Sequence, residues 1–339
     1  MHWLKNTIYI ILGLLLVLGT VLFFLSQKDK PEVITYGMSF KTPYARELGL
    51  DWKEVYDAFI DDLNVRHLRL AAHWPMVEPM QNIYNFTELD YQIKRAEEVD
   101  ATVVLAVGRR LPRWPECHIP SWARDLSEAE RNAALLRYME QVVSRYKSSS
   151  AVKIWQIENE PFLTVFAYDH CGDLDKDLLE KEMVRSIDDS RPILITDSGN
   201  MGTWTGAYKR GDMFGTSVYV HLWNPELGPL KTILPPWFYR VKDNVMAILY
   251  GDKPTMLIEL SAEPWLIEPI TEAPLEVQLS RMNLQKFEEI LDYAEGTHFD
   301  KQYLWGAEWW YWLMLKGHPE MWERGQRLFG KEVSETSVE

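Results

Sequence analysis

Short apolar runs alternate with longer amphipathic segments along most of the chain. The apolar runs short enough to form buried strands are Val33–Ser39, Val65–Ala71, Ala101–Val107, Val152–Ile157, Ile193–Asp197, Phe214–Val220, Thr255–Glu259 and Tyr303–Trp309. Helical patterns between them are Trp52–Asp62, Leu89–Val99, Glu128–Tyr146, Leu174–Ile187, Pro236–Leu249, Leu275–Tyr293 and, at the end, Pro319–Phe329. Strands that alternate with helices predict a parallel sheet with crossover connections.

The number of these units selects among the α/β folds. Eight units in about 300 residues fit a (β/α)8 TIM barrel better than an open doubly wound sheet. The first strand is not followed by the Gly-rich phosphate loop of nucleotide-binding folds. The fifth helix is the weakest part of the pattern, because only Thr205–Lys209 is available for it. We predict a barrel over residues 33–330, with functional residues at the C-terminal ends of its strands.

An uncharged apolar segment precedes this pattern. Residues 8–25 read IYIILGLLLVLGTVLFFL, and at about 1.5 Å per residue such a helix nearly crosses a hydrocarbon core of roughly 30 Å. A cleaved signal peptide is the alternative, but its apolar region is usually shorter and ends in small residues rather than in two phenylalanines and a leucine. We predict a transmembrane signal anchor, preceded by a tail over residues 1–7 and followed by a polar linker over residues 26–32.

The chain contains two cysteines, and their state bears on location. Cys117 and Cys171 follow the predicted third and fourth strands, which are neighbours at one face of a barrel. A disulfide there would agree with an extracytoplasmic barrel on a single-pass membrane protein, whereas the charges flanking the anchor are too balanced to fix its orientation. Two free thiols, or a metal site with His118 and His170, are the alternatives, although this spacing is unusual for zinc. Residues 331–339 are predicted to be a disordered tail.

Composition narrows the class of ligand. The net charge of −14 excludes a nucleic-acid partner, because phosphate neutralisation requires clustered lysine and arginine. The 15 tryptophans and 16 tyrosines supply a large core, but their flat rings also suit the C–H face of a sugar.

Two acidic residues stand at the ends of predicted strands. Glu160 follows the fourth strand, and Glu259 ends the seventh. Burying an acid at a barrel strand end is costly unless the acid has a function. Glycoside hydrolysis needs two carboxyl groups, one to protonate the leaving oxygen and one to attack or to activate water. The pair therefore predicts a glycoside hydrolase.

The sequence around both acids carries a family resemblance. The Asn-Glu-Pro run at residues 159–161 and the segment Pro254–Glu259 resemble the two signatures of glycoside hydrolase clan A, a superfamily of retaining (β/α)8 enzymes. The resemblance covers most of Val33–Phe329. It implies that Glu160 is the general acid/base and Glu259 the nucleophile of a retaining β-glycoside hydrolase. Such an enzyme acts on an oligo- or polysaccharide and needs neither a cofactor nor a metal.

The resemblance also assigns supporting roles. Asn159 matches the residue that hydrogen-bonds the substrate 2-hydroxyl. Arg69 matches the arginine that holds the nucleophile ionised, and Tyr219 matches the tyrosine that donates to it. A tryptophan of the predicted eighth strand should form the floor of the sugar site, and Trp309 fits best. The alternatives on that strand are Trp305 and Trp310.

Other candidates lie beside the predicted strand ends. The further candidate substrate-binding residues are His73, Trp74, Arg109, His221, Glu263 and Trp265. Packing roles are equally open for His73, Trp74 and Arg109. Glu158 is interpreted as a structural ion-pair partner or a peripheral contact. Some, not all, of the loop tryptophans are expected to form subsite platforms, and besides Trp265 these are Trp114, Trp122, Trp204 and Trp223.

The chain departs from the best-known branch of the clan, the family-five cellulases and mannanases. Those enzymes have a histidine after strand three, where this chain has Gly-Arg-Arg at residues 108–110. They also have His-x-Tyr on strand six, where this chain has the reverse order in Tyr219-Val220-His221. The substrate of that branch therefore does not transfer to this chain. Two alternative functions are a non-catalytic, membrane-anchored carbohydrate-binding barrel and a transglycosylase that acts on surface glycans.

Overall fold

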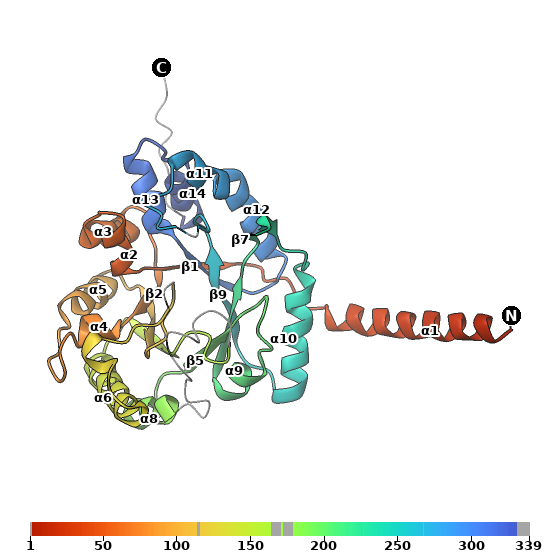
Figure 1. Cartoon of the computed structure of the whole chain (residues 1–339), viewed down its shortest axis with the longest axis horizontal. Helices are drawn as coiled ribbons and strands as arrows, with labels where there is room; N and C mark the ends of the chain where they lie inside the picture. Colours follow the sequence, from red (N-terminus) through yellow and green to blue (C-terminus); the bar gives the residue numbers. More distant parts are fainter. Residues whose placement is uncertain are drawn as a thin grey trace, which may run out of the picture.

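Eight parallel strands of the chain close into a barrel (Figure 1). The computed structural model describes residues 2–113, 116–163, 171, 179–224, 226–266 and 268–330. The barrel strands are β1 (Thr35–Ser39), β2 (His67–Ala71), β3 (Thr102–Val107), β4 (Val152–Ile157), β5 (Ile193–Asp197), β6 (Met213–Val218), β9 (Thr255–Ser261) and β10 (Lys301–Trp305). They follow the order β1-β10-β9-β6-β5-β4-β3-β2 around the barrel. The predicted (β/α)8 barrel is confirmed.

Helices cover the outside of the barrel. They are α2 (Thr42–Glu47), α3 (Trp52–Asp61), α4 (Trp74–Val77), α5 (Thr87–Glu98), η1 (Ser121–Ala123), α6 (Glu128–Tyr146), α8 (Leu179–Ile187), α9 (Thr205–Arg210), α10 (Trp237–Tyr250), α11 (Leu275–Arg281), α12 (Leu284–Glu295), α13 (Ala307–Leu315) and α14 (Glu320–Leu328). Helix α6 begins with a capping box between Ser127 and Glu130, which satisfies backbone N–H groups of the first turn. The short α9 fills the connection between β5 and β6.

Two features near the mouth of the barrel were not predicted. A hairpin of β7 (His221–Asn224) and β8 (Gly228–Lys231) is inserted after β6. The predicted helix over residues 275–293 is divided into α11 and α12, because Asn283 begins a new helix there by accepting a hydrogen bond from the backbone N–H of Lys286.

The predicted end of the eighth strand was wrong. Strand β10 ends at Trp305, and Gly306 follows with a φ of 110°. This left-handed conformation suits glycine and ends the extended chain. Helix α13 begins at the next residue, so Trp309 lies on a helix rather than on the strand.

The register along β9 shifts just before Glu259. Strand β6 pairs Thr216 with Leu257 and then Ser217 with Glu259, which leaves Ile258 as an extra residue. An extra residue bends a strand and changes the direction of the side chains that follow. Strict alternation would place Ile258 and Glu259 on opposite faces, whereas the shift lets both face the interior of the barrel.

The apolar N-terminal segment forms one long helix, α1 (His2–Leu25). It extends away from the barrel (Figure 1). Within it, residues Asn6–Leu25 are long and apolar enough to cross a membrane, and none of the span is buried against the barrel. The predicted tail over residues 331–339 lies outside the described residues.

Candidate active site

An arginine and a tyrosine hold the carboxyl group of Glu259. Arg69, on β2, donates from Nη1 to Oε1 of Glu259 at 2.8 Å. Tyr219, just after β6, donates its hydroxyl to Oε2 at 2.9 Å. Burial, followed by the charge of Glu259, raises the pKa of Tyr219 well above its usual value, so the phenol remains a donor. The carboxyl group of Glu259 thus has a buried guanidinium on one oxygen and a hydroxyl donor on the other.

The Arg69 side chain is itself fixed by β4 and the residues after it. Its Nε donates to Oε1 of Gln156 at 2.8 Å, and its Nη2 donates to Oδ1 of Asn159 at 2.8 Å. The guanidinium therefore links the ends of β2, β4 and β9 with a planar fork of donors. Sequence reasoning missed Gln156, which is buried and points inward from β4.

Glu160 lies in a different environment from Glu259. Its backbone N–H donates to Oγ1 of Thr196 at 2.8 Å, and its Oε1 accepts from the hydroxyl of Ser217 at 2.9 Å. Its φ of 46° is a left-handed conformation that is uncommon for a residue with a side chain. No arginine or lysine hydrogen-bonds its carboxyl group within the described part of the chain.

The two carboxyl groups influence each other. Burial raises the pKa of Glu160 well above its usual value, and the negative charges of Glu259 and then Glu116 raise it further, against a lowering by the Ser217 hydrogen bond. The shift favours the protonated form of Glu160, whereas Glu259 forms an ion pair with Arg69. Two side chains of the same type therefore lie in contrasting surroundings within one site.

A third carboxyl group, Glu116, was missed by sequence reasoning. Its Oε2 accepts from Nε of Arg110 at 2.9 Å, and its Oε1 accepts from Nδ2 of Asn159 at 3.4 Å. Burial raises the pKa of Glu116, and the charge of Glu259 raises it further against the lowering by Arg110. No local pattern identifies Glu116, because it lies well beyond the end of β3 and reaches the site through the fold of its loop.

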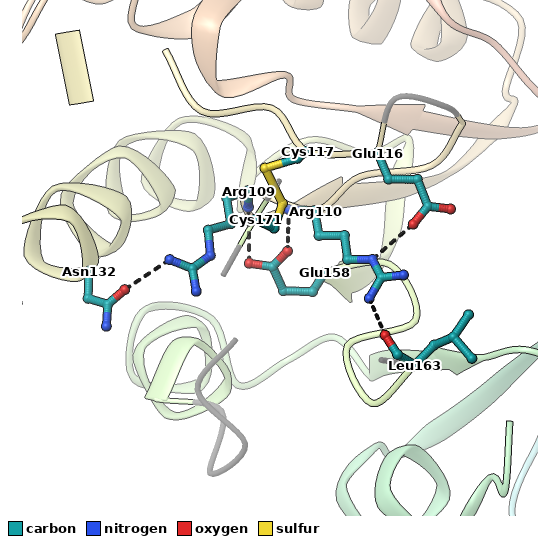
Figure 2. The surroundings of a disulfide bond; sticks show 8 residues. All are labelled: Arg109, Arg110, Glu116, Cys117, Asn132, Glu158, Leu163 and Cys171. Carbon is teal, nitrogen blue, oxygen red and sulfur yellow. Dashed lines mark hydrogen bonds and ion pairs between the residues drawn. A yellow bond between two sulfur atoms is a disulfide. The ribbon is translucent and has the colours of Figure 1, made fainter. Parts of the chain in front are cut away.

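That loop is tied to the end of β4 by Glu158 and to a residue of the β4–α8 connection by a disulfide (Figure 2). Cys117 and Cys171 form the disulfide, with their Cα atoms 5.3 Å apart. Glu158 accepts from the backbone N–H groups of Arg109 at 3.0 Å and of Arg110 at 2.6 Å. Burial and the charge of Glu180 raise the pKa of Glu158 to about 8. Glu158 thus has a structural role, although its partners are backbone groups rather than the predicted ion-pair partner.

Aromatic rings lie on the Glu259 side of the site. Tyr219 makes edge contacts with Trp265, at 5.2 Å between centroids, and with Trp305, at 6.3 Å. The indole Nε1 of Trp305 is buried and has no hydrogen-bond partner among the described residues. A buried donor without a partner is costly unless a ligand satisfies it. Of the candidates for a sugar-site floor, Trp305 lies beside Tyr219, whereas Trp309 is packed in the core.

Glu263 contributes a second ion pair near this wall. Its carboxylate is paired with the guanidinium of Arg113 through two hydrogen bonds, one of them 2.7 Å from Nη1 to Oε2. The same guanidinium stacks on the ring of Tyr44 at 3.1 Å and lies 5.3 Å from the centroid of Trp305. Glu263 thus holds the guanidinium of Arg113 in place near the ring of Trp305.

Several predicted sugar contacts have packing roles instead. Trp309 is fully buried and donates to Oε1 of Gln278 at 2.7 Å. Trp74 is fully buried, stacks on Tyr138 and donates to Glu78 at 2.7 Å. The guanidinium of Arg109 turns away from the mouth to Asn132, at 3.2 Å. In each case the side chain is buried and hydrogen-bonds within the protein, so it presents little surface to a ligand.

The two histidine candidates occupy different positions. His73 is buried with its ring against that of His118, at 4.6 Å between centroids, and burial lowers its pKa well below the usual value. His221 lies on the inserted hairpin, where Nε2 is 3.3 Å from a carboxylate oxygen of Glu289. Neither hydrogen-bonds Glu160 or Glu259 within the described residues.

The loop tryptophans also divide between roles. Trp204 is fully buried and donates to the backbone oxygen of Ser198 at 3.0 Å. Trp122 donates to the backbone oxygen of Glu78 at 3.0 Å, and the ring of Trp223 lies under the guanidinium of Arg281. Among the loop tryptophans that the structure describes, only Trp265 contacts a residue that holds Glu259. Trp114 and His170 lie outside the described residues.

Comparison with known proteins identifies the fold. Neither a protein-family model nor a curated protein matches the chain. Among solved structures, GH5_18 from Bifidobacterium longum subsp. longum matches with a TM-score of 0.56 and 14% identity, over 80% of this chain and 69% of that one. A glycoside hydrolase family 10 endo-β-1,4-xylanase from Gloeophyllum trabeum matches with a TM-score of 0.51 and 15% identity, over 80% and 83%.

A further solved structure is the lactosyl-enzyme intermediate of endo-glycoceramidase II from a Rhodococcus species. It matches with a TM-score of 0.50 and 14% identity, over 80% of this chain and 72% of that one. At such identities the comparisons establish the architecture. The likeness to glycoside hydrolases expected from the two signatures is confirmed for the fold, and the chain shares its (β/α)8 barrel with solved members of those enzymes.

Proposed function

We propose that the chain is a retaining β-glycoside hydrolase in which Glu160 is the general acid/base and Glu259 the nucleophile. The observation that carries the proposal is the contrast between the two carboxyl groups. Glu259 pairs with Arg69 and accepts from Tyr219, whereas Glu160 is buried, accepts from a neutral hydroxyl and has a strongly raised pKa. Double displacement needs this combination of one anion and one acid.

The first step forms a glycosyl-enzyme ester. A carboxylate oxygen of Glu259 bonds to the anomeric carbon while the bond to the leaving oxygen breaks, and Glu160 transfers its proton to that oxygen. The ester removes the negative charge of Glu259, so the pKa of Glu160 falls by the contribution that this charge made. Glu160 is then ionised at the moment when a base is required.

The second step releases the sugar. Water attacks the anomeric carbon from the vacated side, Glu160 accepts a proton from the water, and Glu259 leaves as a carboxylate. Both steps balance with the two carboxyl groups and water. Arg69 and Tyr219 stabilise the carboxylate at the beginning and at the end of the cycle, and Asn159 lies beside Glu160 with its amide nitrogen toward Glu116.

The apolar helix α1 supports a proposal about location. We propose that it is an uncleaved single-pass anchor and that the barrel is extracytoplasmic. The helix leaves the barrel with none of its apolar span covered, which is unstable in water. The disulfide Cys117–Cys171 favours an oxidising compartment.

The test of the activity uses the full chain in lipid nanodiscs with a panel of aryl β-glycosides and polysaccharides. We expect hydrolysis whose first product is the β-anomer, together with a loss of activity in Glu259→Gln and Glu160→Gln. The matched control is Glu272→Gln, an exposed carboxyl group away from the site. An activated 2-deoxy-2-fluoro glycoside should label Glu259, and labelling of another residue would refute the assignment of the nucleophile.

The same panel separates the alternative functions. Full hydrolysis by Glu259→Gln would overturn the mechanism. Binding of glycans without turnover would indicate a carbohydrate-binding barrel. Preferential transfer to an added acceptor sugar over water would indicate a transglycosylase, which shares the glycosyl-enzyme intermediate.

A further inference from the structure

The segment between α1 and the barrel is docked against the barrel. The side-chain amide of Asn244, on α10, donates to the backbone oxygens of Leu25 at 2.7 Å and of Gln27 at 2.9 Å. These oxygens lie at the C-terminal end of α1, where helix carbonyls lack partners within the helix. Asn244 therefore caps the predicted anchor from the barrel side.

Three further contacts hold the same segment. Lys28 forms an ion pair with Asp243, and its backbone oxygen lies 2.6 Å from Nδ1 of His298. Lys30 forms an ion pair with Glu295. The predicted linker is thus fixed against α10 and the turn before β10, and the barrel is not free to turn about the end of α1.

Helix α10 lies across the axis of α1 (Figure 1). It forms the side of the barrel from which α1 leaves. If α1 crosses a bilayer along the membrane normal, α10 lies along the bilayer surface. The residues on the outer face of α10 then meet the headgroup region.

Those residues are apolar and exposed at both ends of the helix. Trp237 is 41% exposed at the beginning of α10, and Ile248 is 72% and Leu249 60% exposed at its end. Ile233, just before the helix, is 95% exposed. At 3.6 residues per turn, Trp237, Asn244 and Ile248 lie on one stripe. Trp237 and Ile248 are therefore on the stripe that caps α1, and Leu249 lies next to it on the helix.

We propose that this α10 face, formed by Ile233, Trp237, Ile248 and Leu249, rests on the phospholipid bilayer and holds the barrel on its side. Because the linker is docked on the barrel, it provides no flexible segment that would let this face move away from the bilayer surface. Tryptophan and aliphatic side chains gain free energy when they enter the interfacial region of a bilayer. The proposal rests on the proposed anchor but not on the proposed catalysis.

The orientation limits which glycans can reach the site. Helix α10 follows β6 and the mouth hairpin, so Trp237 lies toward the mouth end of the barrel and Ile248 toward the opposite end. If both ends of α10 lie at the bilayer, the mouth of the barrel opens parallel to the membrane surface rather than away from it. The substrate class is then a saccharide held close to the bilayer, such as the headgroup of a glycolipid or a membrane-bound glycan.

The test measures the depth of the α10 face without any need for activity. The full chain carries a single introduced thiol, Ile248→Cys, labelled with an environment-sensitive fluorophore, while the native cysteines are protected in their disulfide. The matched control is Leu315→Cys, an aliphatic residue of similar exposure at 59%. It ends α13, a helix that lies away from α1 (Figure 1). Both proteins are reconstituted in phosphatidylcholine vesicles that contain nitroxide-labelled lipid.

We expect lipid nitroxides to remove most of the fluorescence at position 248 and little at position 315. Asn244→Ala should weaken the quenching at position 248, because it removes the cap that fixes α10 to α1. Equal quenching at both positions in vesicle-bound protein would overturn the proposal and leave the anchor intact. Failure to float with the vesicles would overturn the anchor as well. A blue-shifted probe that lipid nitroxides do not quench would assign the face to a second copy of the chain and refute the bilayer contact.

Discussion

The Nη1 atom of Arg69 lies 2.8 Å from Oε1 of Glu259, and both side chains are almost closed to solvent. Separating a buried pair leaves an uncompensated charge, which costs about 3–5 kcal/mol. The ion pair therefore links the stability of the barrel to the charge of the proposed nucleophile.

Replacing Arg69 should affect both properties. We expect Arg69→Met to lower kcat/KM by about 100-fold or more and the free energy of unfolding by about 3 kcal/mol. Arg69→Lys should rescue little, because the single nitrogen of an ammonium group cannot replace the three separate guanidinium nitrogens that reach Glu259, Gln156 and Asn159. Steady-state kinetics and denaturant unfolding measure the two effects. Activity close to that of the unaltered protein in Arg69→Met would refute this role.

The hydroxyl of Ser217 should set the alkaline limb of the pH–rate profile. Its hydrogen bond to Glu160 stabilises the carboxylate and lowers the pKa of that group. Ser217→Ala removes the bond, so we expect the alkaline limb of kcat/KM to move to higher pH. Ser280→Ala, an exposed serine on α11, should leave the profile unchanged, and a shift of Ser217→Ala to lower pH would contradict the assignment.

Neutralising Glu116 should shift the same limb in the opposite direction. The negative charge of Glu116 raises the pKa of Glu160, so Glu116→Gln should lower that pKa and move the alkaline limb to lower pH. The glutamine can still accept from Arg110, which limits the structural effect. The pair Ser217→Ala and Glu116→Gln therefore gives two shifts of opposite sign, and identical shifts would exclude Glu160 as the titrating acid.

Stability should fall as pH rises above the usual carboxyl range. The pKa of Glu158 is about 8 in the folded chain against a usual 4.5. The contribution of this group to the free energy of unfolding is therefore largest below pH 4.5 and is lost as the pH rises through about 8. Between these values the folded state binds more protons than the unfolded state. Denaturant unfolding from pH 5 to 8 measures the slope, and Glu158→Gln should flatten it. An unchanged slope would contradict the raised pKa of Glu158.

Two tryptophans should give opposite results when shortened to phenylalanine. Trp305→Phe should raise KM and leave stability nearly unchanged, because its indole N–H has no partner among the described residues. Trp309→Phe should lower the free energy of unfolding by about 1–3 kcal/mol, through the lost bond to Gln278 and the cavity, with little effect on KM. Kinetics and thermal unfolding of both variants would show whether the sugar-site floor is assigned to the right residue.

Local pattern alone determined the architecture of the barrel. The apolar runs located β4 and β5 at their observed bounds, and the amphipathic pattern of Glu128–Tyr146 located α6 in the same way. Both acids could be identified because each stands where an apolar run ends. Periodicity and chain order are properties of neighbouring residues, and a sequence displays them directly.

Tertiary contacts decided how the side chains meet. The register shift at Ile258, set by pairing with β6, turns Glu259 inward. Gly306 ends β10 and sends Trp309 into the core, which leaves Trp305 beside Tyr219. Glu116 reaches the carboxylate pair only because its loop is fixed to β4. Each of these outcomes depends on residues far apart in the chain, so the sequence identified the proposed catalytic pair and the packed barrel decided its surroundings.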